Sequence, residues 1–173
     1  MTFYVGARCW YPSKEHGWVG AEIIELNSES TEARLRLEND EEIEINLDKI
    51  KEDFNDALHL RNPPALEATD DLTSLTFLNE PAVLHAIKKR FTDKNIYTYS
   101  GIVLIATNPF ANVDELYSPE KIHEYSTNRK EDLQPHIFAI ADSAFKHMKN
   151  YGENQTIIVS GESGAGKTVS AKY

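Results

Sequence analysis

Eight consecutive residues have the types and spacing of a phosphate-binding loop. Gly161-Glu162-Ser163-Gly164-Ala165-Gly166-Lys167-Thr168 matches the pattern G-x-x-x-x-G-K-[ST] of many nucleoside triphosphatases. Its glycines let the backbone approach phosphate oxygens closely, and successive N–H groups then point into one concavity. Lys167 supplies a positive charge for the β- and γ-phosphates, and the Thr168 hydroxyl is a ligand for Mg²⁺. The motif therefore predicts a nucleoside triphosphate site.

The residues on either side of the motif have the composition that such a loop requires. Residues 155–160 (QTIIVS) form a short, β-branched apolar stretch, which is typical of a buried strand. Residues 169–173 can continue a helix that begins near Lys167, and the N-terminus of a helix attracts phosphate. A chance match on a glycine turn is the alternative. The preceding strand favours a true strand–loop–helix unit of an α/β domain.

Composition excludes several classes of protein. The net charge of −10 leaves no basic stripe for binding nucleic acid. Hydrophobic residues make up 40% of the chain, which indicates a packed core rather than disorder. The single cysteine, Cys9, excludes an internal disulfide, and we expect it to be a small buried hydrophobe in a reducing compartment. No secretory signal is present, and the apolar run 102–106 is too short to cross a bilayer, so we expect a cytoplasmic protein without membrane insertion.

The first fifty residues alternate between apolar and polar side chains, as half-buried antiparallel strands do. The alternating apolar positions include Val5, Ala7, Cys9 and Tyr11, then Ala33, Leu35 and Leu37, then Ile43, Ile45 and Leu47. Asn39-Asp40 is a turn pair between the last two runs and predicts a hairpin. Four or five short strands in this length predict a small all-β barrel. We expect the acidic residues of the hairpin to form a solvated face rather than a cation site.

Beyond Asn62-Pro63-Pro64, which marks a linker, the pattern becomes α/β. Asn79 is a predicted N-cap, and the helix after it would carry Val83, Leu84, Ile87 and Phe91 along one apolar face. Residues 99–107 contain a second strand of the buried type, and further helices are expected from Ser118 and from Pro135. The last of these has a broad apolar face that we expect to be core: Ile137, Phe138, Ile140, Ala141, Ala144, Phe145 and Met148. The six histidines show no metal-ligand spacing.

Segments along nearly the whole chain resemble the opening of a myosin motor domain. They are residues 71–85, 97–101 (YTYSG), 108–110 (NPF), 135–139 (PHIFA) and the phosphate loop 161–168, in the family's order and spacing. Residues 9–12, 106–110 and 168–173 are most similar to class V myosins of the fungal type. The resemblance implies an α/β P-loop NTPase, an incomplete myosin motor domain, preceded by a small all-β SH3-like barrel. The implied division is a barrel in 1–55, a linker in 56–70 and the motor part in 71–173.

The resemblance also assigns roles to particular residues. Asn108 and Pro109 would begin the loop that binds the purine, and Tyr117 would be the aromatic residue that closes it. An Asn-Pro turn after a buried strand is compatible with this role, because nucleotides bind at the carboxyl ends of strands in open α/β sheets. Ser163 would face the γ-phosphate and act with Lys167 in catalysis, although the residues alone leave open that Ser163 is a plain loop residue. The whole loop Gly161–Thr168 would bind ATP, with Thr168 on Mg²⁺.

The implied function is that of an actin-based motor ATPase, which couples ATP hydrolysis to cargo transport along actin filaments in the cytoskeleton. Actin and calmodulin-type light chains would bind parts of a longer parent. The family's Asn-x-x-Ser-Ser-Arg and Asp-x-x-Gly-Phe-Glu segments do not occur in these 173 residues. We therefore expect a fragment that binds ATP but hydrolyses it poorly. The alternatives are a stand-alone P-loop nucleotide-binding protein and an SH3-like interaction module.

Overall fold

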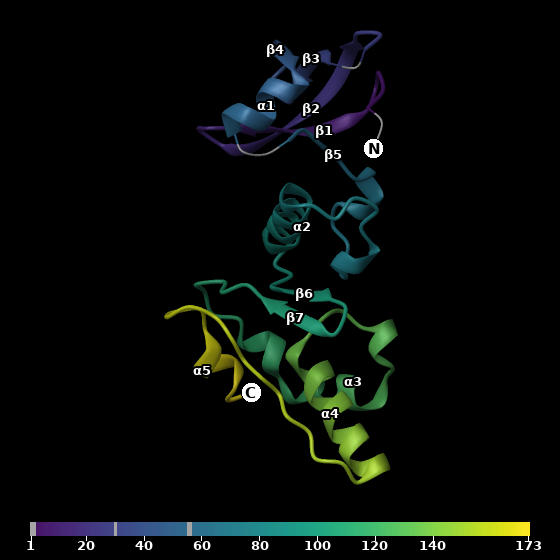
Figure 1. The fold of residues 1–173 in the computed structure, drawn as a ribbon. Helices are drawn as coiled ribbons and strands as arrows, with labels where there is room; N and C mark the ends of the chain where they lie inside the picture. Colours follow the sequence, from purple (N-terminus) through teal and green to yellow (C-terminus); the bar gives the residue numbers. More distant parts are fainter. Residues whose placement is uncertain (1–2, 30, 55–56) are drawn as a thin grey trace. The chain divides into compact units, whose positions relative to one another are not determined.

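The computed structural model describes residues 3–29, 31–54 and 57–173, which form two compact units (Figure 1). The first unit comprises Met1–Glu67 with Leu75–His85, and the second comprises Ala68–Ser74 with Ala86–Tyr173. Each unit therefore contains a segment that lies, in sequence, within the span of the other. The division into residues 1–55, 56–70 and 71–173 stays a prediction.

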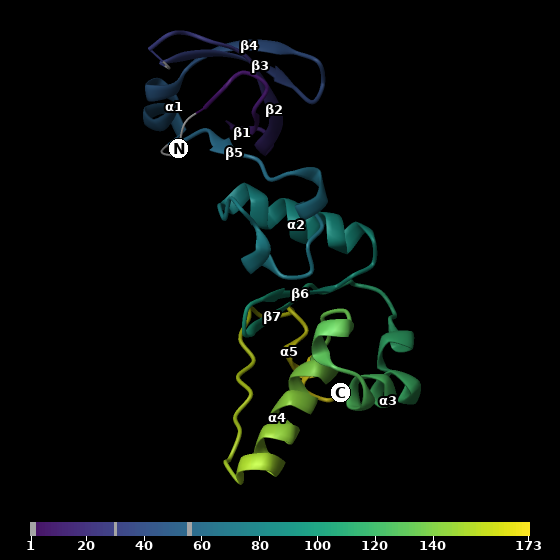
Figure 2. The ribbon, with the colours of Figure 1, turned by 90° about the vertical axis from the view of Figure 1, so that its right-hand side faces the viewer.

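A five-stranded antiparallel sheet dominates the first unit. Its strands are β1 (Arg8–Ser13), β2 (Gly17–Leu26), β3 (Glu32–Leu37), β4 (Glu42–Asn46) and β5 (His59–Leu60), in the order β4-β3-β2-β1-β5, with helix α1 (Leu47–Phe54) after β4. In Figure 2 the strands follow one another around a curved sheet. The predicted hairpin is present, since Arg36 pairs with Glu42 and Asp40 adopts a left-handed φ of 65° in the turn. This architecture is compatible with the predicted SH3-like barrel.

Apolar side chains of the sheet, of α1 and of the adjoining segments form one core. Its buried members are Ala7, Cys9, Ala21, Ile23, Ala33, Leu35, Ile45, Leu47, Ile50, Leu58 and Leu60. The prediction for Cys9 is confirmed, because its side chain is fully buried and desolvation raises the pKa of its thiol to about 12. A thiol with such a pKa carries almost no thiolate at neutral pH and is chemically inert.

Four charged or titratable side chains of the first unit form one group around Glu67. We name this group the Glu67 cluster; its members are Arg8, Arg61, Glu67 and His85. Arg8 Nη2 donates to Glu67 Oε1 at 2.7 Å, Arg61 Nε donates to the same oxygen at 2.5 Å, and His85 Nε2 lies 3.3 Å from Glu67 Oε2. Burial alone would raise the pKa of Glu67. The hydrogen bond from Arg61 and the charges of Arg61 and Arg8 outweigh burial and lower that pKa to about 2.

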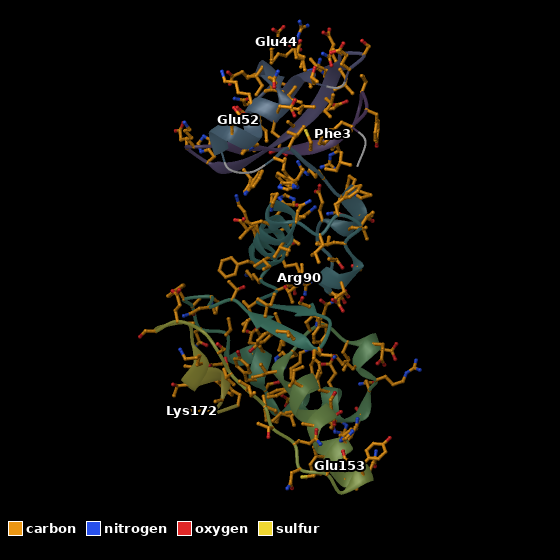
Figure 3. The ribbon with its side chains drawn as sticks, viewed as in Figure 1. Phe3, Glu44, Glu52, Arg90, Glu153 and Lys172 are labelled. Atoms are coloured by element: carbon orange, nitrogen blue, oxygen red, sulfur yellow. The ribbon has the colours of Figure 1, made fainter. Side chains whose placement is uncertain are left out.

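Helix α2 (Glu80–Thr92) begins where the sequence predicts, and its buried residues include a charged one. The Asn79 side chain caps it by accepting from Ala82 N at 3.0 Å. The predicted apolar face is partly open to solvent, since Leu84 is 53% exposed and Phe91 is 39% exposed. The buried residues include Ala86 and Arg90. Arg90 (labelled in Figure 3) is tolerated there because its guanidinium donates to the Tyr97 carbonyl at 2.9 Å and to Thr98 Oγ1 at 3.1 Å.

After the end of α2, the second unit contains one hairpin and three further helices, joined by turns that include 3₁₀ segments. The hairpin pairs β6 (Tyr97–Ser100) with β7 (Val103–Ala106), and the helices are α3 (Pro119–Thr127), α4 (Ile137–Tyr151) and α5 (Lys167–Ser170). The 3₁₀ segments of the chain are Pro64–Leu66, Leu72–Ser74, Asp114–Tyr117 and Lys130–Asp132. The predicted helix starts are confirmed, with Ser118 capping α3 and His136 capping α4. The strand predicted within residues 99–107 is confirmed as β7, which follows a turn at Gly101 with a left-handed φ of 61°, but its side chains are exposed or half-buried rather than buried.

Two further expectations for the second unit are not met. Residues 155–160 form no strand among the described residues, and Ile158 in this stretch is 87% exposed (yellow in Figure 1). A strand needs neighbours that satisfy its N–H and C=O groups, and no described strand pairs with this stretch. The predicted core face of α4 is buried only at Phe138 and the adjacent Ala139, whereas Phe145 is 57% exposed and Met148 is 43% exposed.

Candidate functional site

A pocket of about 440 Å³ in the second unit brings together two loops that lie some fifty residues apart in sequence. One loop follows β7, and the other precedes α5. The lining residues are Ile96, Tyr97, Ala106, Thr107, Asn108, Pro109, Phe110, Ala111, Asn112, Val113, Asp114, Tyr117, Ala165, Gly166, Val169, Ser170 and Tyr173. Five of the predicted site residues therefore line one cavity: Asn108, Pro109, Tyr117, Ala165 and Gly166.

Asn108 links the two loops directly. Its Oδ1 accepts from Phe110 N at 3.0 Å, which folds the chain into a tight turn after β7. The same arrangement directs Nδ2 to the Gly164 carbonyl, at 3.0 Å. A single amide side chain thus uses its acceptor to shape its own loop and its donor to hold the phosphate loop.

Tyr117 closes the other end of the first loop, at the last residue of the 3₁₀ turn Asp114–Tyr117. Its hydroxyl lies 2.7 Å from that of Tyr97, with which it shares a hydrogen bond. The ring of Tyr173 stacks on the Tyr117 ring with centroids 3.7 Å apart and planes 6° from parallel. Tyr117 therefore presents a flat face that accepts a planar group.

The phosphate loop has the backbone that its glycines predict. Gly164 and Gly166 adopt φ values of 82° and 96°, which side chains with a Cβ rarely reach, and α5 begins directly afterwards at Lys167. A Cβ added at Gly161 would lie 3.3 Å from the Ala165 Cβ, so the loop is closely folded there. Such a loop fits a phosphate, because small residues keep its backbone accessible.

Lys167 lies against this loop. Its Nζ donates to the Gly161 carbonyl at 2.6 Å and to the Glu162 carbonyl at 2.7 Å. A lysine held by neutral carbonyls can exchange them for phosphate oxygens, which form stronger, charge-assisted hydrogen bonds. Ser163 and Thr168 are exposed on the same loop. Neither they nor Gly161, Glu162, Gly164 and Lys167 line the pocket, so these six residues form a second, open part of the candidate site.

Thr168 offers one hydroxyl oxygen to a metal ion. No group of three or more His, Cys, Asp or Glu side chains that could hold a metal occurs among the residues that the structure describes. Mg²⁺ prefers six oxygen ligands, and it is commonly held by one or two protein groups together with substrate phosphates and water. The residues present therefore fit a Mg²⁺ that arrives with a triphosphate rather than a dedicated protein cage.

Sequence reasoning did not assign Tyr97 or Tyr173 to the site. Tyr97 is 96% buried and lies next to the loop, because it pairs with Ala106 across the β6–β7 hairpin and Thr107 N donates to the Ile96 carbonyl at 2.9 Å. Recognition of that hairpin would have placed Tyr97 beside the Asn108 turn. No local signal marks Tyr173 as a stacking partner.

Comparison with known proteins identifies the relatives of this chain. The family model described as "Myosin head (motor domain)" matches residues 69–173. Myosin-2 of Saccharomyces cerevisiae is 60% identical over all of this chain, which covers 11% of the relative's length. Myosin-4 of the same yeast is 56% identical, with 100% and 12% covered, and human unconventional myosin-Va is 48% identical, with 96% and 9% covered. The chain thus spans about a tenth of the length of the curated relatives it matches. Within its described part, every helix is too short or too polar to cross a bilayer.

Proposed function

Since this chain belongs to the myosin family, we propose that it forms the ATP-binding part of an actin-based motor. The family match and the identity to yeast and human myosins confirm the resemblance to a myosin heavy chain that the sequence indicates. In this proposal ATP hydrolysis drives movement of the longer protein along actin filaments, with calmodulin-type light chains and cargo bound by other parts of it. Its place would be the cytoplasmic actin cytoskeleton.

The observation that carries the proposal is the joining of the two loops. The Asn108–Gly164 hydrogen bond and the shared pocket support the proposal, because the loop that ends at the Tyr117 ring lies next to the loop that contains Gly164. A nucleotide has both of the groups that such a site would recognise, a flat base and a charged phosphate chain. We assign the base to the Tyr117 side and the phosphates to Gly161–Thr168.

Three residues of the phosphate loop have separate roles in this proposal. Lys167 leaves the carbonyls of Gly161 and Glu162 and contacts the β- and γ-phosphates. The Thr168 hydroxyl would hold Mg²⁺, which would neutralise phosphate charge when bound, and Ser163 would face the γ-phosphate. The exposed stretch 155–160 would acquire strand neighbours from the rest of the motor domain.

The test is Lys167→Ala in the full-length protein. We expect loss of ATP turnover and at least a tenfold weaker binding of a fluorescent ATP analogue, because the charge opposite the phosphates is removed. Binding is measured by titration, and motor function is measured by ATP-dependent release from sedimented actin. Lys172→Ala is the matched control, since Lys172 is an exposed lysine outside the pocket.

Near-normal turnover in the Lys167 variant would reject the assignment of the phosphate loop. ATP binding without any association with actin would favour the stand-alone nucleotide-binding protein. Partner capture by residues 1–55 alone, with no nucleotide effect, would favour the interaction module. Each result therefore points to one of the three functions.

A further inference from the structure

Tyr97 holds one end of the loop that would carry the base. It is 96% buried at the start of β6, and its hydroxyl reaches the Tyr117 hydroxyl at 2.7 Å, twenty residues away in sequence. The other end of the loop is anchored to the adjacent residue, because Thr107 N donates to the Ile96 carbonyl at 2.9 Å. Residues 107–117 are thus attached at both ends to two adjacent residues, Ile96 and Tyr97, at the start of β6.

Tyr97 is itself rigidly placed. Its carbonyl accepts from Nη2 of the buried Arg90 at 2.9 Å, and its backbone pairs with Ala106 in the hairpin. The edge of its ring packs on His136, with centroids 5.0 Å apart. His136 is 97% buried, and burial lowers its pKa to about 4, so the ring next to both tyrosines stays neutral at physiological pH.

The Tyr117 ring has contacts on its edge and stacks by one face. His136 lies 5.7 Å from it at a tilt of 52°, and Phe138 meets it in a T-shaped contact at 6.2 Å. Tyr173 stacks nearly parallel to it at 3.7 Å. Among the described residues, the hydroxyl of Tyr117 has one hydrogen bond, which it shares with the hydroxyl of Tyr97, and this bond restrains the tilt of the ring.

We infer that Tyr97 is a positioning residue for base recognition: its hydroxyl fixes the plane of Tyr117 so that a nucleotide base can stack on that ring. The inference rests on the proposed nucleotide site and adds a residue to it. Stacking on an aromatic ring contributes mainly through contact area and depends on parallel planes, so a ring that is free to tilt binds a base less well. Among the described residues, no hydrogen bond joins the Tyr97 hydroxyl to the phosphate loop, so we expect that loop to keep its own affinity.

The experiment compares Tyr97→Phe, Tyr117→Phe and the double variant in the full-length protein. ATP and inorganic pyrophosphate each compete with a fluorescent ATP analogue, and KM and kcat for ATP are measured alongside. We expect Tyr97→Phe to weaken ATP about three- to tenfold, with pyrophosphate affinity unchanged and KM raised at constant kcat. Both single variants remove the same hydrogen bond, so the double variant is expected to weaken ATP no further than either one alone.

Tyr125→Phe is the matched control. Tyr125 is a buried tyrosine that packs on the same His136, and its hydroxyl donates to the Gln134 carbonyl at 2.8 Å, but it does not line the pocket. It loses a comparable hydrogen bond in the same aromatic group. We expect the thermal unfolding midpoint of Tyr125→Phe to shift by a similar amount to that of Tyr97→Phe, and its ATP affinity to stay at the wild-type level.

Three outcomes would overturn the inference. An unchanged ATP affinity in Tyr97→Phe would show that the hydroxyl does not matter for binding. Equal losses of ATP and pyrophosphate affinity would show a general effect on the fold, and additive losses in the double variant would show that the two tyrosines act independently. Failure of the wild-type protein to bind either ligand would instead reject the proposed function on which the inference rests.

Discussion

The two units of this chain differ in how well their apolar side chains are buried. In the first unit the sheet closes over a core in which Cys9, Ile23 and Leu35 are fully buried. In the second unit, stretches that are equally apolar remain open to solvent, including Ile158 at 87% exposure and Phe145 at 57%. Each unit contains a buried charged side chain that has hydrogen-bond partners. Glu67 accepts from Arg8 and Arg61, and Arg90 donates to a carbonyl and a hydroxyl oxygen.

The difference follows from how far apart in sequence the hydrogen-bond partners of each segment lie. Neighbouring strands of the first sheet are mostly neighbours in sequence, so a short segment brings its own hydrogen-bond partners and its own core. The stretch before the phosphate loop finds no strand partner among the described residues, although its composition is that of a buried strand. The first unit is therefore expected to be the more stable part of this chain.

The largest loss of stability is expected from removing a buried side chain from the core of the first unit. Leu35→Ala should destabilise the first unit by about 4 kcal/mol, because the removed side chain is fully buried and leaves a cavity. Urea unfolding followed by tryptophan fluorescence measures this unit selectively, since both tryptophans of the sequence, Trp10 and Trp18, lie in it. Leu84→Ala, at a half-exposed position of the same unit, should cost less than about 1 kcal/mol. Similar losses for the two variants would mean that the core is not closed.

An effect of intermediate size is expected from the Glu67 cluster. Glu67→Gln should cost about 3 kcal/mol at neutral pH, because it removes the buried carboxylate that pairs with both Arg8 and Arg61 and leaves Arg61 with Glu38 alone. The same fluorescence-detected urea unfolding measures the loss. Glu22→Gln, an exposed glutamate on β2, is the control and should have almost no effect.

The pH dependence of this variant sharpens the test. The folded-state pKa of Glu67, about 2, lies below its ordinary value of 4.5, so the carboxylate stabilises the fold above the ordinary value. That stabilisation is lost as the pH falls from about 4.5 toward about 2. The difference between wild type and Glu67→Gln should shrink over this window. A difference that stays constant with pH would show that the loss comes from packing and not from charge.

The smallest effect is expected where the second unit is open. Ile158→Ser in the 173-residue chain should change the unfolding free energy by less than about 0.5 kcal/mol, because the side chain is 87% exposed. Far-UV circular dichroism during thermal unfolding measures it, with Phe138→Ala as the contrasting buried position. A loss above about 1 kcal/mol for Ile158→Ser would show that this stretch is covered in solution and would remove the contrast between the units.

The sequence by itself determined the features that depend on local spacing. The period-two alternation identified the antiparallel strands and the burial of Cys9 and Leu35, because successive side chains of a strand point to opposite faces. Asn79 and Ser118 marked helix starts, since their side chains satisfy the free N–H groups of a first turn. The types and order of residues 161–168 predict a phosphate loop, and its role in binding phosphate stays a prediction.

Only the tertiary structure decided what depends on contacts between distant segments. It buried Arg90 on a face of α2 that its charge argued against, because oxygen acceptors from β6 meet the guanidinium there. It placed Tyr97 beside Tyr117 and joined Asn108 to Gly164 across fifty-six residues, and neither pairing has a local signature. The apolar pattern of residues 155–160 predicts a strand, but a strand forms only where another strand offers its N–H and C=O groups, and composition alone does not supply that neighbour.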